Sequence, residues 1–193
     1  MKDRLEEYIR NWVPSPLDSE VEEILDLFSP KSFKKGEFFK KPFTKGLEIA
    51  FIPEGAIRTI IYDDQGEETT FRIREKNVLL IDPIRLMDPN DSAPREAGAE
   101  CLEDLSMLVC DFKPFEDLLM TNLALNVVVR KHATQQMIDI GRQQLLFLTG
   151  SASDRYNYIM EHHPSLIQKF PLRLIASMIG VTPTQLSRVR NKK

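Results

Sequence analysis

Hydrophobic positions divide the chain into a strand-like first half and a helical second half. Short runs of alternating apolar and polar residues occur at 35–39, 47–52, 56–62 and 69–73, and a later one at 106–111. Turn residues separate the first four, for example Pro53-Glu-Gly55 and Asp63-Asp-Gln-Gly66. Regularly spaced alternating segments of this kind predict an antiparallel barrel or jelly roll.

Helical periodicity lies on both sides of these strands. Residues 1–29 form two short amphipathic patterns interrupted by Pro14-Ser-Pro16, and a helical tract starts at Pro114. A long helix is expected from about Asn122 to Leu148, with a length of about 40 Å. A break at 149–153 is typical of a hinge, and a helix over 152–162 follows. Its inward-facing residues are expected to be Tyr156, Ile159 and Met160.

One stripe of the long helix has almost the spacing of a coiled-coil seam. Its members are Leu125, Val129, Ala133, Gln136, Ile140, Gln143 and Phe147. A helix of this length extends past a small barrel, which favours a dimer seam. Packing of the stripe on the strands of its own chain explains the pattern equally well.

The last two dozen residues have the pattern of a helix-turn-helix. Ala176 is four residues before Gly180, and Leu186 is six residues after it. The motif needs a small residue where two helices touch, a glycine in the left-handed turn and an apolar anchor in the second helix. Thr182-Pro183 supplies a capping hydroxyl and a proline at the first helical position. The apolar seam is expected to contain Ile175, Ile179, Leu186 and Val189. An ordinary helical hairpin is the alternative.

Charge is distributed unevenly along the chain. Residues 149–193 hold seven basic and two acidic residues, a net charge of +5 in a chain whose total is −3. The rest therefore carries −8. A basic end on an acidic body indicates that this end meets a polyanion.

Composition excludes several other classes. The sequence has no run of about twenty apolar residues and no secretion signal at its start, so we expect a cytoplasmic protein without a membrane span. The cysteines Cys101 and Cys110 are expected to be reduced thiols, and the three histidines are scattered, so no metal or cofactor is predicted. No catalytic triad order, phosphate-binding glycine loop or metal-ligand spacing is present, so an enzyme is not expected.

This order of parts resembles the Crp–Fnr family of bacterial regulators. The N-terminal fragments that carry the resemblance are Lys35-Gly-Glu37, Gly46, Phe51-Ile-Pro-Glu-Gly55 and Asp64-Gln-Gly-Glu67. The resemblance implies an α+β fold with a cyclic-nucleotide-binding-like β-roll at 1–113, a connecting and dimerising helix at 114–148, and an all-α helix-turn-helix domain at 149–193. It also implies a homodimer, joined through the long helix, that places two recognition helices in successive major grooves of double-stranded DNA.

The match to the family's effector cassette fails at 77–100. The family uses a Gly-Glu pair and an arginine followed by Ser or Thr, but here Arg95 is followed by Glu96 and no Gly-Glu pair occurs. Acidic residues outnumber Arg85 and Arg95, so the region would repel a phosphate. We expect no binding of cyclic AMP or cyclic GMP, and another small effector or none. Arg85, Arg95 and Glu96 remain the candidate ligand residues, with an ion pair as the plainer interpretation of Arg95.

The resemblance carries the family's base-reading positions to Pro183, Thr184 and Arg188. Proline replaces the arginine that many relatives use at the first position, whereas Arg188 can bond guanine through its bidentate fork. The full set of candidate DNA contacts is Thr182, Pro183, Thr184, Gln185, Ser187, Arg188, Arg190 and Lys192. The family's β-hairpin wings are not expected, because only 163–170 separates the helices, so binding should be weaker and more salt-sensitive.

The sequence therefore predicts a DNA-binding transcriptional regulator. The alternative is a cyclic-nucleotide or other small-ligand sensor, or an interaction module, whose terminal helices only pack.

Overall fold

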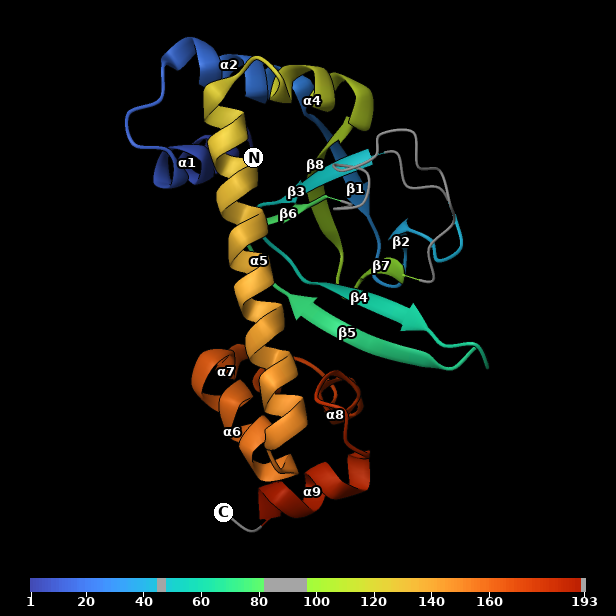
Figure 1. The fold of residues 1–193 in the computed structure, drawn as a ribbon. Helices are drawn as coiled ribbons and strands as arrows, with labels where there is room; N and C mark the ends of the chain where they lie inside the picture. Colours follow the sequence, from blue (N-terminus) through green and yellow to red (C-terminus); the bar gives the residue numbers. More distant parts are fainter. Residues whose placement is uncertain (45–47, 82–96, 192–193) are drawn as a thin grey trace.

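The protein begins with two helices, continues with strands and ends with six further helices (Figure 1). The computed structural model describes residues 1–44, 48–81 and 97–191. The strands are β1 (Ser29–Phe33), β2 (Phe38–Lys40), β3 (Glu48–Ile52), β4 (Ile57–Tyr62), β5 (Glu68–Arg74), β6 (Val78–Leu80), β7 (Ala97–Cys101) and β8 (Leu105–Asp111). The helices are α1 (Lys2–Trp12), α2 (Asp18–Leu27), α4 (Phe112–Leu119), α5 (Leu123–Thr149), α6 (Ala152–His162), α7 (Pro164–Lys169), α8 (Leu172–Met178) and α9 (Pro183–Asn191).

The described strands form two four-stranded antiparallel sheets. Their orders are β1-β8-β3-β6 and β2-β7-β4-β5. Strand β3 is buried on both faces because its side chains alternate: Ala50 and Ile52 face the apolar layer between the sheets, and Ile49 and Phe51 face the helices. This is the antiparallel roll that the alternating runs predict.

Helices cover the outer face of the first sheet. Leu5 and Ile9 of α1, Ile24 of α2 and Phe115 of α4 join Phe51 in one buried cluster, to which the first turns of α5 also belong. From there α5 runs along the molecule to the C-terminal helices (Figure 1).

The predicted stripe on α5 faces the protein's own chain. Leu125 and Val129 are buried among the N-terminal helices, Phe147 packs with the C-terminal helices, and Gln136 and Gln143 bond to β5 and α8. Five of its seven residues are therefore engaged within the chain, so the assignment of this stripe to a dimer seam is wrong. Packing on the same chain, the alternative that the pattern left open, is what occurs.

Three strands and one side chain differ from the sequence prediction. β1 has the sequence Ser-Pro-Lys-Ser-Phe, with one apolar side chain, and is held by pairing with β8. β6 is three residues long, and β7 contains mainly small residues, so neither shows clear alternation. Met160 of α6 is 42% exposed and does not face inward as predicted.

No helix within the described ranges is long and apolar enough to cross a membrane. The same residues contain no cluster of His, Cys, Asp or Glu that could hold a metal ion.

Candidate nucleic-acid interface

The four C-terminal helices share one apolar core at the end of the molecule farthest from α2 (Figure 1). Tyr156 and Ile159 of α6, Leu166 of α7 and Ile175 of α8 are buried there with Leu186 of α9. The predicted hinge is a short connection, because α5 ends at Thr149 and α6 begins at Ala152.

Helices α8 and α9 form the predicted helix-turn-helix. Ala176 and Leu186 are fully buried, at 0% exposure, which is the close contact that the sequence spacing requires. Gly180 has φ +65, the left-handed conformation that glycine adopts without strain. The Val181 amide donates to the Ala176 carbonyl at 3.0 Å and closes the turn.

Arg155 of α6 fixes this turn from outside the motif. Its Nη1 donates to the carbonyls of Ile179 (3.2 Å) and Gly180 (3.4 Å), and its Nη2 donates to the Phe147 carbonyl of α5 at 2.8 Å. The guanidinium also lies over the Phe147 ring, 4.9 Å from its centroid. Arg155 therefore joins the end of α5 to the turn, a positioning role that sequence spacing did not indicate.

Thr182 and Gln185 form a reciprocal cap at the start of α9. The backbone N–H of Gln185 donates to Thr182 Oγ1 at 3.1 Å, and the backbone N–H of Thr182 donates to Gln185 Oε1 at 2.9 Å. The cap uses the side-chain oxygen Oε1 of Gln185, so only the side-chain nitrogen Nε2 remains for a base contact.

The face of α9 opposite its core carries Thr184 and Arg188. Each lies about 160–200° around the helix from Leu186, which anchors the helix in the core. Both side chains are exposed, as are Pro183, Ser187 and Arg190. This outward side matches the predicted reading face. Lys192, the remaining candidate contact, lies outside the described residues.

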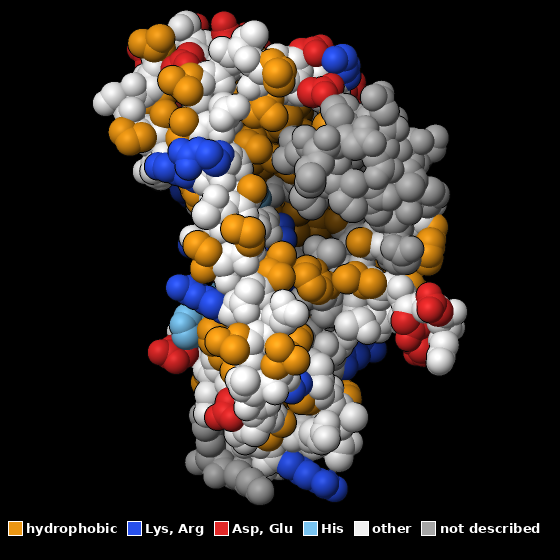
Figure 2. All heavy atoms as spheres, in the orientation of Figure 1, with side chains coloured by type: hydrophobic (Ala, Val, Ile, Leu, Met, Phe, Trp, Pro, Cys, Tyr) orange, Lys and Arg blue, Asp and Glu red, His pale blue; other side chains and the backbone are white. Residues whose placement is uncertain are grey.

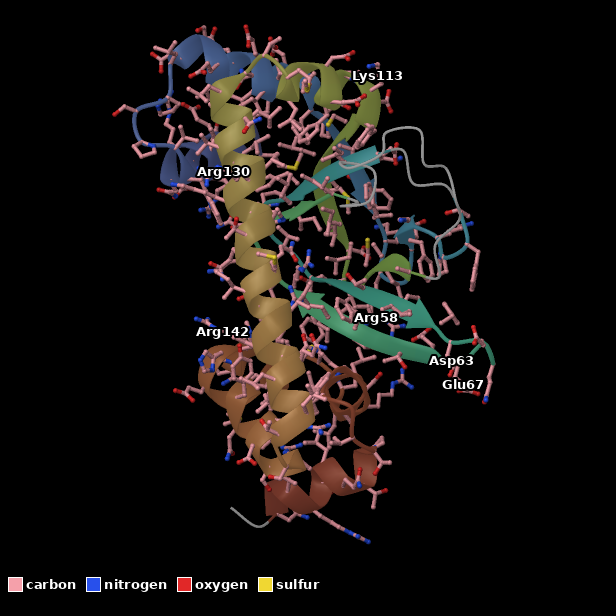
Figure 3. All side chains as sticks on the ribbon, in the orientation of Figure 1. Arg58, Asp63, Glu67, Lys113, Arg130 and Arg142 are labelled. Atoms are coloured by element: carbon pink, nitrogen blue, oxygen red, sulfur yellow. The ribbon has the colours of Figure 1, made fainter. Side chains whose placement is uncertain are left out.

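The helix-turn-helix is docked on the roll. Ser177 of α8 accepts a hydrogen bond at 2.8 Å from the backbone amide of Thr70 on β5, a residue with 1% exposure. Ile73 of β5 belongs to the apolar core of the C-terminal helices. The other end of this hairpin, at the β4–β5 turn, carries Asp63 and Glu67, away from the helices (Figure 3). No sequence motif predicted this contact, since Thr70 and Ser177 are 107 residues apart.

The predicted effector residues Arg85, Arg95 and Glu96 lie outside the described ranges. Within the described residues 149–191 there is no strand, and the segment 163–170 contains the short helix α7 (Pro164–Lys169).

Several solved structures have the same arrangement of roll, long helix and terminal helices. FixK2 from Bradyrhizobium japonicum aligns with a TM-score of 0.71 at 14% identity, covering 86% of this chain and 83% of that one. A putative transcriptional regulator of the Crp/Fnr family from Eubacterium rectale gives 0.70 at 15% identity, over 94% and 87% of the two chains. The c-di-GMP responsive global regulator CLP from Xanthomonas campestris gives 0.69 at 13% identity, over 90% of each.

The chain has the Crp–Fnr fold. At this level of sequence identity the similarity establishes the fold, including the order of its parts. No protein-family model matches the chain, and no curated protein matches its sequence. Within the Crp–Fnr fold, α9 occupies the terminal position, with its polar face uncovered by any described residue of the chain.

Proposed function

We propose that this protein is a sequence-specific DNA-binding transcriptional regulator and that α9 is its recognition helix. The observation that carries the proposal is the exposed face of α9, where Thr184 and Arg188 point away from a buried Leu186 anchor. A helix of this size fits the major groove, and an arginine there can bond both O6 and N7 of guanine.

Charge and capping support the same orientation toward DNA. Arg188 and Arg190 lie in the last turn of α9, and Ser187 is exposed beside them. The first turn of α9 offers backbone amides of the kind that bind phosphate oxygens. We assign the base contacts to Thr184 and Arg188, with Pro183 and Gln185 beside them, and phosphate contacts to Thr182, Ser187, Arg190 and Lys192.

We further propose that the protein acts as a homodimer joined along the outer face of α5. Met137 is 68% exposed, Leu145 62% and Leu148 77%, and Ile138 lies beside them. Hydrophobic side chains are visible along the exposed side of the molecule on which α5 runs (Figure 2). Gly141 lies between Met137 and Leu145, and an added Cβ there would meet no other atom within 4 Å. Glycine inside a helix lowers stability by about 0.5–1 kcal/mol relative to alanine. Close packing of a second helix against Gly141 would explain why a glycine occupies this position.

The effector proposal remains that cyclic AMP and cyclic GMP do not bind the roll. It rests on the acidic surplus and the missing Gly-Glu pair at 77–100. Isothermal titration of the protein with each nucleotide should give no heat of binding. A low-micromolar affinity for either would contradict it.

The DNA proposal is tested first by selecting bound duplexes from a random library. A symmetric pair of half-sites is expected, because a two-fold dimer reads two successive grooves. Electrophoretic mobility shifts on the selected site should weaken steeply when salt is raised, because phosphate contacts release counterions.

The variant Arg188→Ala then distinguishes a base-specific contact of Arg188 from a contact with phosphate on any sequence. We expect a loss of about 1–3 kcal/mol on the selected site and a relaxed preference at one base position. Lys113→Ala is the control, because Lys113 carries the same charge but lies in α4 at the other end of the molecule (Figure 3). An equal loss on all duplexes would show that Arg188 only contacts phosphate. A protein that binds no duplex at low salt would support the sensor or interaction module instead.

A further inference from the structure

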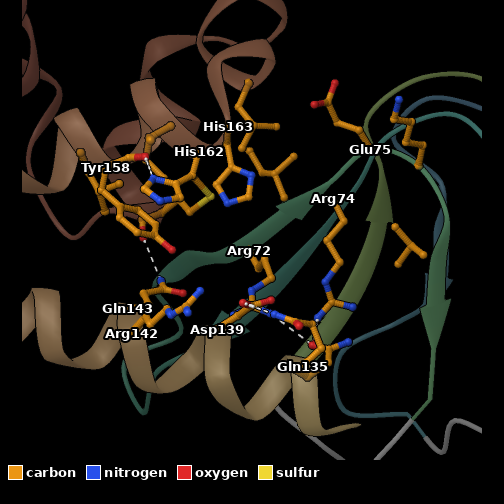
Figure 4. Close-up of a pocket in the computed structure, with 18 of the residues that line it drawn as sticks. Arg72, Arg74, Glu75, Gln135, Asp139, Arg142, Gln143, Tyr158, His162 and His163 are labelled. Atoms are coloured by element: carbon orange, nitrogen blue, oxygen red, sulfur yellow. Dashed lines mark hydrogen bonds between the residues drawn. The ribbon is translucent and has the colours of Figure 1, made fainter. Parts of the chain in front are cut away.

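A cavity of about 530 Å³ lies where the roll, the long helix and the C-terminal helices meet. Strand β5 forms one side, α5 a second, and α6 and α7 a third (Figure 4). Of the described residues in the stretch 77–100, Asn77 and Val78 line it. Its volume is within the range of cavities that bind small molecules.

Two arginines of β5 extend into this cavity, and no described residue forms an ion pair with either. Arg72 and Arg74 are two residues apart on one face of the strand, and both point toward α5 (Figure 4). Arg72 Nη1 and Arg74 Nη2 donate to the same atom, Gln136 Oε1, at 3.2 and 2.8 Å. Within the described part of the chain, neither guanidinium has a carboxylate within ion-pair distance. Among the described residues, the two charges share one neutral hydrogen-bond acceptor, and the Asp139 carboxylate attracts both only from beyond ion-pair distance.

Arg58 on the adjacent strand β4 is, in contrast, paired with carboxylates. Its guanidinium bonds the carboxylates of Glu68 and Glu100, and also the Thr70 hydroxyl. For Arg74, burial and then the neighbouring charge of Arg72 together lower the pKa to about 10. The pKa of Arg72 is also lowered, chiefly by burial. Among the described residues, neither side chain makes a close ion pair of the kind that Arg58 makes, although the charge of Asp139 acts on both.

The other charged groups of the cavity wall increase this positive surplus. Lys76, Arg142 and Arg155 also line it, against the carboxylates of Glu75 and Asp139 among the described lining residues. Glu75 is already bonded to Ser165 and to Lys169, the latter at 2.7 Å. Asp139 accepts a hydrogen bond from Gln135 at 2.9 Å. The buried Nε of Arg155 has no hydrogen-bond partner among the described residues.

Flat side chains form the remaining wall. Tyr158 and His162 stack with their ring centroids 4.2 Å apart, and Phe147 lies beside the Arg155 guanidinium. A cavity with cationic groups on one side and rings on another suits a molecule with an anionic head and a flat body.

We propose that this cavity binds a small phosphate-bearing molecule whose phosphate group is held by Arg72 and Arg74. A phosphate monoester carries about two negative charges near neutral pH, which offsets two guanidiniums, whereas a single carboxylate offsets one. The planar fork of arginine bonds such oxygens in pairs. Since the cavity touches β5, α5, α6 and α7 together, the bound molecule would contact both the roll and the helices that carry α9.

The test uses phenyl phosphate as the probe and benzoate as its matched carboxylate, with inorganic pyrophosphate as a second phosphate compound. Binding to the full-length protein is followed by isothermal titration and by the shift in thermal unfolding temperature. The variants are Arg72→Gln and Arg74→Gln. Arg130→Gln is the control, because it removes the same charge from an exposed position of α5 that does not line the cavity.

We expect saturable binding of phenyl phosphate or pyrophosphate to the wild type and to Arg130→Gln. Affinity should fall about tenfold or more in each cavity variant, since each loses a charge-assisted hydrogen bond. Without probe, both cavity variants should unfold at the same or a higher temperature than the wild type, because an unpaired buried charge is removed. This second measurement shows that a loss of binding is not a loss of fold.

Three results would overturn the proposal: no saturable binding of either phosphate compound, equal binding in the wild type and both cavity variants, or binding of benzoate alone. The titrations contain no DNA, so their outcome is independent of the proposed function of α9.

Discussion

Asn122 is a buried polar side chain that joins two helices. It is 3% exposed, accepts the Leu125 amide at 2.9 Å as the cap of α5, and donates to the Glu20 carbonyl (3.0 Å) and the Glu23 carboxylate (2.9 Å). The side chain therefore satisfies groups on α2 while it begins α5.

Asn122→Ala should lower the free energy of unfolding by about 2 kcal/mol, because it removes a helix cap and the hydrogen bonds that this buried side chain donates to α2. Urea denaturation measures this change. Asn126→Ala, one turn further along and exposed, is the control and should change stability by less than about 0.5 kcal/mol. Equal effects would mean that the buried contacts of Asn122 contribute nothing.

His132 sits in a chain of hydrogen bonds that fixes its protonation state. Gln136 Oε1 accepts from two arginines, so Gln136 Nε2 donates to His132 Nε2 at 2.8 Å. The imidazole proton is then on Nδ1, which faces the Tyr8 hydroxyl at 3.0 Å. Burial and the charge of Arg74 lower the pKa of His132 to about 4, so the ring is neutral in the folded protein.

A lowered histidine pKa makes stability depend on pH in a defined window. The unfolded chain binds a proton at His132 below about pH 6.5, and the folded chain does so only below about pH 4. The neutral ring therefore contributes to the free energy of unfolding above this window, and the contribution is lost as pH falls through it. From pH 7 to 4.5 the wild type should lose about 2 kcal/mol more than His132→Gln in urea denaturation. Parallel losses in the two proteins would contradict the neutral assignment.

At the scale of elements, α5 has one face toward its own chain and another that no described residue covers. Leu145→Glu places a charge in the proposed seam, so a wild-type dimer should become a monomer in analytical ultracentrifugation. Met120→Glu is the control, because Met120 is 81% exposed but precedes α5. A monomeric wild type, or dimers in both variants, would exclude this face as the interface.

The elements that the sequence predicted best are those whose signals are local. The cap at Thr182, the turn at Gly180 and the period of α5 each depend on neighbouring residues, so spacing was enough. β1 was missed because its stability comes from pairing with β8, about eighty residues away. The direction of the α5 stripe was misassigned because periodicity identifies a buried face but not the partner that buries it.

At the scale of the whole molecule, the contact between β5 and α8 joins the roll to the helix-turn-helix. Ser177→Ala leaves the buried Thr70 amide without an acceptor, at a cost of about 1–3 kcal/mol. Hydrogen–deuterium exchange should then rise in β5 and α8, while α1 and α2 stay protected. Ser187→Ala, on the exposed side of α9, should leave exchange unchanged. Unchanged exchange in Ser177→Ala would mean that the docking does not depend on this bond.

The cavity beside this contact could not be predicted from the sequence. Arg72 and Arg74 occur in a strand run, Gln136 in a helix stripe and His162 before a proline, and none of these patterns indicates the others. Only the crossing of β5, α5 and α6 brings the groups together. The sequence therefore predicted the helix-turn-helix geometry, which is contiguous, and missed the cavity, which is assembled from three distant segments.

The hydrogen bond between Thr70 and Ser177 also bears on the geometry of any target duplex. Because α8 is anchored to β5, the two copies of α9 in a dimer would keep a fixed distance from each other and a fixed angle around the duplex axis. Inserting one base pair between half-sites rotates them by about 34–36° around the duplex axis. Such a protein would tolerate few changes in operator phasing.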